Sequence, residues 1–203
     1  MGINAKLGEI ELVVTWVCNW HCPYCAVDTH SRANLSLADV MDKISLIPDG
    51  SRVTLSGGEV GTMQRIHIQQ IIQTLSDKQC ELSLNTNGLF LKRYPDLVST
   101  FAEVLYHCSE NLDPVKIPKY DYPNVEYMII VTDRNIKNLP AFLHINSDIT
   151  FHIIASTLPK GIDGDILSNA NRYHVVTTHH NRMTTESKIR MFKEKDFDAI
   201  TYL

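Results

Sequence analysis

Short apolar runs rich in β-branched residues recur along the chain, and segments of helical periodicity separate them. The first run, residues 9–17 (EIELVVTWV), predicts a buried strand. Similar runs predict further strands at 52–56, 81–84, 103–108, 125–132 and 150–155, and a small strand at 174–177. Amphipathic or capped segments predict helices at about 36–47, 64–76, 97–101, 136–143 and 185–195.

This alternation of strands and helices favours βαβ units and a parallel sheet with outer helices. Six units are too few for a complete eightfold barrel, so we expect an open, partial (β/α)6 TIM-like barrel. Three prolines punctuate residues 109–124, where we expect no full helix. We expect one domain over 1–203, with a core at about 9–156 and a segment 157–203 that completes or caps the barrel.

The composition is that of an ordinary globular protein, with 44% hydrophobic and 21% charged residues. A net charge of −4 gives no support to non-specific nucleic-acid binding through a basic face, although a nucleotide substrate is compatible with it. No apolar run approaches the roughly 20 residues needed to span a bilayer, and the amino terminus lacks the apolar core of a signal peptide. We therefore expect a cytoplasmic protein without a membrane partner.

Three of the five cysteines, Cys18, Cys22 and Cys25, lie within eight residues at C-x3-C-x2-C spacing. Such a cluster suits a metal centre better than a disulfide framework. An iron–sulfur cubane usually takes four thiolates, so three would leave one iron open for chemistry. A non-enzymatic alternative is a zinc or iron–sulfur binding module in which His21 or His30 completes the site.

Two further polar motifs follow the next two predicted strands. Residues 56–59 (SGGE) come after the second strand, and residues 85–88 (NTNG) come after the third. Because reactive residues collect at the carboxyl ends of strands in such folds, we expect both motifs beside the cysteine loop.

Together these motifs resemble those of the radical S-adenosylmethionine (radical SAM) enzymes. The family pattern CxxxCxΦC, in which Φ is aromatic, matches Cys18, Cys22, Tyr24 and Cys25. Its GGE motif matches residues 57–59, and a frequent TNG motif matches residues 86–88. The resemblance covers roughly residues 9–156.

The resemblance implies a [4Fe–4S] cluster on the three cysteines, with S-adenosylmethionine chelating the open iron. A flavodoxin- or ferredoxin-like donor would supply an electron, and the cleaved cofactor would yield a 5′-deoxyadenosyl radical that abstracts hydrogen from a substrate. Such an enzyme would be oxygen-sensitive. The residues that would contact S-adenosylmethionine are Tyr24, Ser56, Gly57, Gly58, Glu59, Thr86, Asn87 and Ser109.

Each of these residues also has a structural interpretation. Gly57 and Gly58 suit an ordinary turn, Glu59 suits the first turn of a helix, and Thr86 and Asn87 suit a turn or cap. No glycine-rich motif follows the fifth predicted strand, so the adenine contacts are left open. His179, His180 and Arg182 are the candidates for substrate contact, with a solvated loop as their alternative.

The predicted function is therefore a radical SAM reaction on a small-molecule or nucleotide-type substrate. No cysteine follows Cys108, which leaves no ligands there for the extra clusters of many peptide-modifying members. Alternatives within the family are a 7-carboxy-7-deazaguanine synthase-like enzyme, a glycyl-radical activase and a peptide maturase.

Overall fold

The structure is a computed structural model. It describes residues 9–22, 25, 34–132, 134–155, 174–175 and 200–202. The described residues form two compact units. Unit 1 contains residues 9–19, 34–104 and 200–202, and unit 2 contains the described parts of 20–25 and 105–175.

The sheet of unit 1 is parallel. Its strands, in the spatial order β3-β2-β1-β8, are β3 (Glu81–Thr86), β2 (Arg52–Gly57), β1 (Glu9–Thr15) and β8 (Ile200–Tyr202). Leu12 of β1 pairs with Leu55 of β2, which in turn pairs with Leu84 of β3. All three leucines are fully buried, so this row of side chains forms the centre of the unit 1 core.

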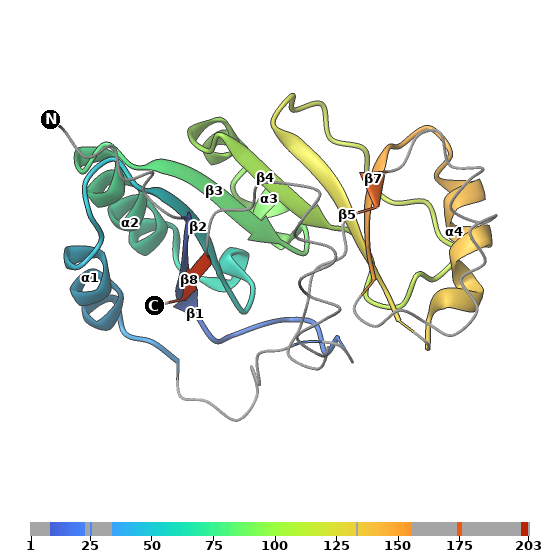
Figure 1. Cartoon of the computed structure of the whole chain (residues 1–203), viewed down its shortest axis with the longest axis horizontal. Helices are drawn as coiled ribbons and strands as arrows, with labels where there is room; N and C mark the ends of the chain where they lie inside the picture. The colour runs from blue at the N-terminus through green and yellow to red at the C-terminus, as the bar shows by residue number, and fades with distance from the viewer. Residues whose placement is uncertain are drawn as a thin grey trace, which may run out of the picture. The chain divides into compact units, whose positions relative to one another are not determined.

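Two helices lie on one side of this sheet (Figure 1). Helix α1 (Leu37–Ser45) begins at a capping box in which the hydroxyl of Ser36 accepts from the Asp39 backbone N–H and the Asp39 carboxylate accepts from the Ser36 N–H. Helix α2 (Arg65–Asp77) presents an apolar stripe to the core. The buried residues of this stripe are Ile68, Ile71, Ile72 and Leu75.

The segment after β3 differs from the predicted structure. Helix α3 (Leu89–Arg93) was not predicted, and the helix expected at 97–101 is a 3-10 helix, η2 (Pro95–Thr100). Gly88 adopts a φ of 97° immediately before α3, which lets the chain turn from strand to helix within two residues, Asn87 and Gly88. A second 3-10 helix, η1 (Val60–Thr62), follows β2.

Strand β4 (Glu103–His107) begins in unit 1 and ends in unit 2. Unit 2 continues with the parallel strands β5 (Val125–Val131), β6 (Phe151–Ala155) and β7 (His174–Val175). The 3-10 helix η3 (Ile136–Asn138) and helix α4 (Leu139–Ile145) connect β5 to β6.

The connection between β4 and β5 contains no helix, as the prolines predicted. Side-chain contacts hold it instead. The hydroxyl of Tyr127 accepts from the Tyr120 N–H at 2.6 Å, and both rings pack edge-on against Tyr106 at 5.5 Å. The buried amide of Asn146 accepts from the Ile117 N–H at 3.0 Å. These contacts satisfy backbone groups that a helix would otherwise pair.

The predicted parallel α/β fold is confirmed, including the small strand near residue 174. Strand β3 extends through Asn85 and Thr86, which had been expected to lie beyond it. Strand β8 was not predicted. The helix expected at 185–195 lies outside the described residues, and closure into a barrel and a single domain stay predictions. None of the helices in the described parts has the length and hydropathy of a membrane span.

Candidate functional site

Backbone hydrogen bonds anchor the start of the cysteine loop to the GGE segment. The Gly58 N–H donates to the Thr15 carbonyl at 2.7 Å, and the Glu59 N–H donates to the Val17 carbonyl at 2.8 Å. The β1–β2 pairing therefore continues, through an irregularity after Val13, to the residue before Cys18. This arrangement places the first cysteine directly beside the GGE segment.

The two glycines allow this close approach. A Cβ added to Gly57 would lie 2.3 Å from the Thr15 carbonyl oxygen, and one added to Gly58 would lie 2.2 Å from the Val17 carbonyl oxygen. Gly57 also has a φ of 114°, which residues with a side chain rarely adopt. Both glycines are thus required by the neighbouring backbone, whether or not a cofactor also approaches them.

Glu59 joins the GGE segment to the TNG segment. Its side chain is 1% exposed and caps η1 by accepting from the Gly61 N–H at 2.7 Å. It also accepts from the Asn87 N–H at 2.6 Å, the Phe90 N–H at 3.2 Å and the Thr86 hydroxyl at 2.9 Å. Burial raises the pKa of Glu59 above its usual value, and the four hydrogen-bond donors offset only part of that rise. The carboxylate is therefore the buried link between the ends of β2 and β3.

Thr86 and Asn87 both take part in this link. The Thr86 hydroxyl donates to Glu59 and accepts from the Gly88 N–H at 3.0 Å, so its hydrogen bonds are made within the protein. The Asn87 side-chain amide donates to Asn19 Oδ1 at 2.9 Å and to Cys18 Sγ at 3.8 Å. The TNG segment thus reaches the first cysteine. Cofactor contacts by Glu59 and Thr86 stay predictions.

The three motif cysteines form no disulfide bond with the other described residues. Cys18 and Cys22 are partly exposed and Cys25 is exposed, with a turn closed by the Cys25 N–H donating to the Cys22 carbonyl at 3.0 Å. Within the described ranges, no three His, Cys, Asp or Glu side chains are gathered as a metal-binding group. The role of the three cysteines as metal ligands stays a prediction. His30, the alternative zinc ligand, lies outside the described ranges.

Two buried polar atoms near these motifs have no hydrogen-bond partner in the part of the chain that the structure describes. They are Ser56 Oγ and Asn85 Oδ1. Ser56 is the residue after Leu55 in β2, and Asn85 is the residue after Leu84 in β3; these two leucines form the last pair of the β2–β3 register. Buried polar groups are normally bonded, so a bound polar ligand would complete this pair.

Sequence reasoning named Ser56 but missed Asn85. The missed signal is the alternation within the two strands. Polar residues occupy every second position and alternate with buried aliphatic ones. The polar positions are Thr54, Ser56, Ser83 and Asn85. One face of the unit 1 sheet is therefore apolar, whereas its opposite face carries hydrogen-bonding side chains.

The end of β4 contacts part of the cysteine loop within unit 2. The Trp20 and His107 rings meet edge-on at 5.8 Å, and Glu110 accepts from the His21 N–H at 3.2 Å. Burial lowers the pKa of His107 to about 4, so its imidazole is neutral near pH 7. Ser109 is buried, and its hydroxyl accepts from the Leu112 N–H at 2.7 Å in a turn. Its proposed cofactor contact stays a prediction.

Several predicted site residues lie outside the described residues. They are Tyr24, His179, His180 and Arg182.

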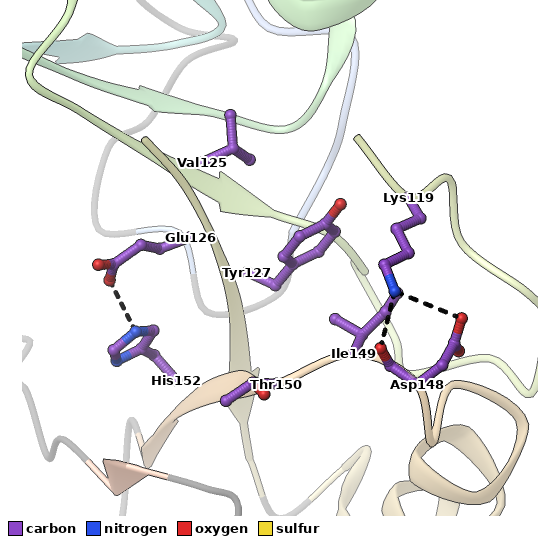
Figure 2. Close-up of a pocket in the computed structure, with 8 residues that line it drawn as sticks. All are labelled: Lys119, Val125, Glu126, Tyr127, Asp148, Ile149, Thr150 and His152. Carbon is purple, nitrogen blue, oxygen red and sulfur yellow. Dashed lines mark hydrogen bonds and ion pairs between the residues drawn. The ribbon is translucent and has the colours of Figure 1, made fainter. Parts of the chain in front are cut away.

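A pocket of about 370 Å³ lies in unit 2, at the amino ends of β5 and β6 (Figure 2). Its ionisable side chains face one another in pairs. Glu126 Oε2 and His152 Nε2 are 2.7 Å apart, and Lys119 Nζ contacts Asp148. Because these side chains are paired and the pocket lies at the amino ends of its strands, whereas reactive residues collect at carboxyl ends, it is not the candidate site.

The donor set fits the implied cluster and cofactor. Cysteine thiolates are the ligand type that iron–sulfur clusters take, and an amide N–H already lies against the first of the three cysteines. The unsatisfied atoms of Ser56 and Asn85 supply hydrogen-bonding capacity for a polar ligand at the next strand ends. The polar face and the cysteine loop thus have the chemistry that the cofactor pair requires.

No family model matches the chain. A probable GTP 3′,8-cyclase from Methanococcus aeolicus is 27% identical over 133 residues, which make up 61% of this chain and 44% of that protein. A protein from Methanocaldococcus jannaschii assigned as a glycyl-radical enzyme activating enzyme is 27% identical over 92 residues, 44% of this chain and 35% of that protein. The chain therefore spans less than half the length of each of these two relatives.

Solved structures with a similar arrangement cover nearly the whole chain. Streptococcus suis SuiB bound to its precursor peptide SuiA aligns with 97% of this chain and 48% of its own, at 12% identity and a TM-score of 0.47. The AdoMet-bound anSMEcpe structure aligns with 97% of this chain and 51% of its own, at 14% identity and a TM-score of 0.41.

The two curated relatives support the interpretation that the motifs suggest. The start of the cysteine loop at Cys18, the GGE segment and the TNG segment, distant in sequence, meet at the ends of three adjacent strands of unit 1. In its motifs and in these two sequence relatives, the chain is similar to enzymes of the radical SAM superfamily.

Proposed function

We propose that this chain binds a [4Fe–4S] cluster through Cys18, Cys22 and Cys25, and cleaves S-adenosylmethionine reductively to act on a small-molecule or nucleotide-type substrate. When bound, the cluster and the cofactor supply one-electron cleavage of a sulfonium and a 5′-deoxyadenosyl radical. A low-potential donor of the flavodoxin or ferredoxin class would provide the electron.

One observation carries this proposal. A continuous set of hydrogen bonds joins the three motifs within unit 1: Val17 to Glu59, Glu59 to Asn87, and Asn87 to Cys18. A turn or a cap would account for each motif separately. Their convergence on the first cysteine is the arrangement expected of a site that must position a metal ligand and a cofactor together.

The residues of the chain have separate tasks in this proposal. The three thiolates hold the cluster and leave one iron without a protein ligand. Gly57 and Gly58 keep the GGE backbone against the end of β1, beside Cys18. The unpaired Ser56 and Asn85 atoms offer hydrogen bonds to a bound ligand. Difficult chemistry is supplied by the cofactor, and the protein supplies position.

The sequence relatives support a nucleotide-type substrate over a protein substrate. The relative that covers 61% of this chain is a probable cyclase of GTP, whereas the activating-enzyme relative covers 44%. The net charge of −4 does not prevent nucleotide binding, because recognition rests on a local site rather than on the overall charge.

The proposal is tested by anaerobic reconstitution with iron and sulfide, reduction with dithionite and chromatographic measurement of 5′-deoxyadenosine. We expect release of 5′-deoxyadenosine by the wild type. Separate Ala variants of Cys18, Cys22 and Cys25 should abolish it, and Cys80→Ala is the matched control that should retain it. Tight binding of zinc without any cleavage of S-adenosylmethionine would favour the non-enzymatic module instead.

A further inference from the structure

Asn87 is held in one orientation by the groups around it. Its backbone N–H donates to the buried carboxylate of Glu59 at 2.6 Å. Its side-chain oxygen accepts from the Leu89 N–H at 3.3 Å, which identifies the oxygen end of the amide. The NH₂ group therefore points the other way, toward Asn19 and Cys18.

The two hydrogens of this NH₂ group each have an acceptor. Asn19 Oδ1 lies 2.9 Å from Asn87 Nδ2, and Cys18 Sγ lies 3.8 Å from it. An amide has two donor hydrogens and no more, so both are used within the protein. This leaves Asn87 little capacity to bind the ribose or carboxylate of a cofactor, which is the role that the sequence suggested for it.

We propose that Asn87 is a positioning residue whose amide donates an N–H···S hydrogen bond to Cys18 and thereby raises the reduction potential of the cluster. This inference rests on the proposed function, because Cys18 must be a cluster ligand. A hydrogen bond to a ligand sulfur withdraws electron density from it and so stabilises the more negative, reduced state of the cluster. Hydrogen bonds to sulfur are among the recognised determinants of cluster potential.

The same contacts explain why an asparagine serves here. An aspartate would keep the oxygen that accepts from Leu89 but would have no N–H for the sulfur, and it would add a negative charge near the cluster. A glutamine would keep the donor on a longer side chain. Comparison of these two replacements therefore separates the effect of the N–H donor from the effect of side-chain size and polarity.

The test is a redox titration of the reconstituted holoenzyme, followed by electron paramagnetic resonance. Wild type, Asn87→Ala, Asn87→Asp and Asn87→Gln are compared, with iron and sulfide content and circular dichroism measured on the same samples. We expect more negative potentials for Asn87→Ala and Asn87→Asp. At the wild-type midpoint, the ratio of reduced to oxidised cluster in Asn87→Ala should fall about threefold to tenfold, the value of one hydrogen bond. The potential of Asn87→Gln should lie between those of Asn87→Ala and the wild type, because glutamine keeps an N–H donor.

Asn19→Ala is the control that separates the sulfur contact from the neighbouring amide contact. It removes the other acceptor of Asn87 and leaves the N–H···S bond possible, so its potential should stay at the wild-type value. An equal fall in Asn19→Ala and Asn87→Ala would show that Asn87 acts through the loop, and would overturn the inference. So would a wild-type potential in a fully loaded Asn87→Ala.

The proposed function fails in a different way. A wild-type chain that takes up no iron–sulfur cluster would overturn the function, and this inference with it. If Asn87→Ala alone fails to retain the cluster, the comparison of Asn87→Asp with Asn87→Gln decides, because only the second keeps the donor. Equal potentials in those two variants would refute the role of the N–H group.

Discussion

Replacement of Glu59 should destabilise the fold more than replacement of any exposed carboxylate in unit 1. Its two oxygens accept from the backbone N–H groups of Gly61, Asn87 and Phe90 and from the hydroxyl of Thr86. Glu59→Ala leaves all four donors without an acceptor in a buried site. Each unsatisfied buried group costs about 1–3 kcal/mol, and allowing for partial relaxation we expect a total loss of about 4 kcal/mol.

Glu59→Gln should cost about half as much. The glutamine oxygen can remain opposite the Gly61 and Phe90 N–H groups, which contact one carboxylate oxygen. Its NH₂ group then faces the Asn87 N–H, which contacts the other oxygen at 2.6 Å, so donor meets donor. This single conflict is worth about 2 kcal/mol.

The assay is urea unfolding of the reduced apoprotein, followed by circular dichroism. Glu81→Gln is the matched control, because Glu81 pairs with Arg52 at the surface and is half exposed. Loss of that surface pair should change the free energy of unfolding by less than about 0.5 kcal/mol. A Glu59→Ala protein as stable as Glu81→Gln would refute the claim that the carboxylate links β2 to β3.

Three further predictions follow from the contacts described. Gly58→Ala should lower the free energy of unfolding by about 3 kcal/mol in the same assay, because its Cβ would collide with the Val17 carbonyl. The pKa of His107 is lowered from 6.5 to about 4, so its contribution to stability is complete above pH 6.5 and lost as the pH falls toward 4. When unfolding curves are measured at a series of pH values, His107→Asn should not show this loss of about 3 kcal/mol in the free energy of unfolding. Asn146→Ala should release the 109–124 segment, measured as faster limited proteolysis and a loss of about 3 kcal/mol.

Each of these predictions has an outcome that would contradict it. Wild-type stability in Gly58→Ala would mean that the backbone accommodates the methyl group. If the pH dependence of stability persists in His107→Asn, other titratable groups cause it. Unchanged proteolysis in Asn146→Ala would show that the tyrosine contacts alone hold the segment.

The sequence predicts the strands of this fold well because both their composition and their spacing are distinctive. Strand β2 is buried on both faces and reads as a short run bounded by glycine, and α2 has an unbroken apolar stripe. Helix α3 was missed because its five residues are too few for a periodic signal and Gly88 looks like a loop residue. Strand β8 was missed because three residues carry no pattern of their own; pairing with β1 defines them.

The candidate site likewise contains residues that the sequence identifies and contacts that only the fold shows. The cysteine spacing and the GGE and TNG motifs are local signals, so their residues were named from the sequence. The linking role of Glu59 was not, because its donors lie up to 31 residues away and only the fold brings them together. Asn85 was hidden within its motif, since only the structure shows that its side-chain oxygen is buried without a hydrogen-bond partner among the described residues.

The central claim is that three cysteines leave one iron of a cluster free to bind S-adenosylmethionine. Its most direct test is the electron paramagnetic resonance spectrum of the reduced, reconstituted protein before and after addition of S-adenosylmethionine. We predict a cluster signal whose g values change when the cofactor binds. A cluster signal that the cofactor leaves unchanged at saturating concentration would contradict the account.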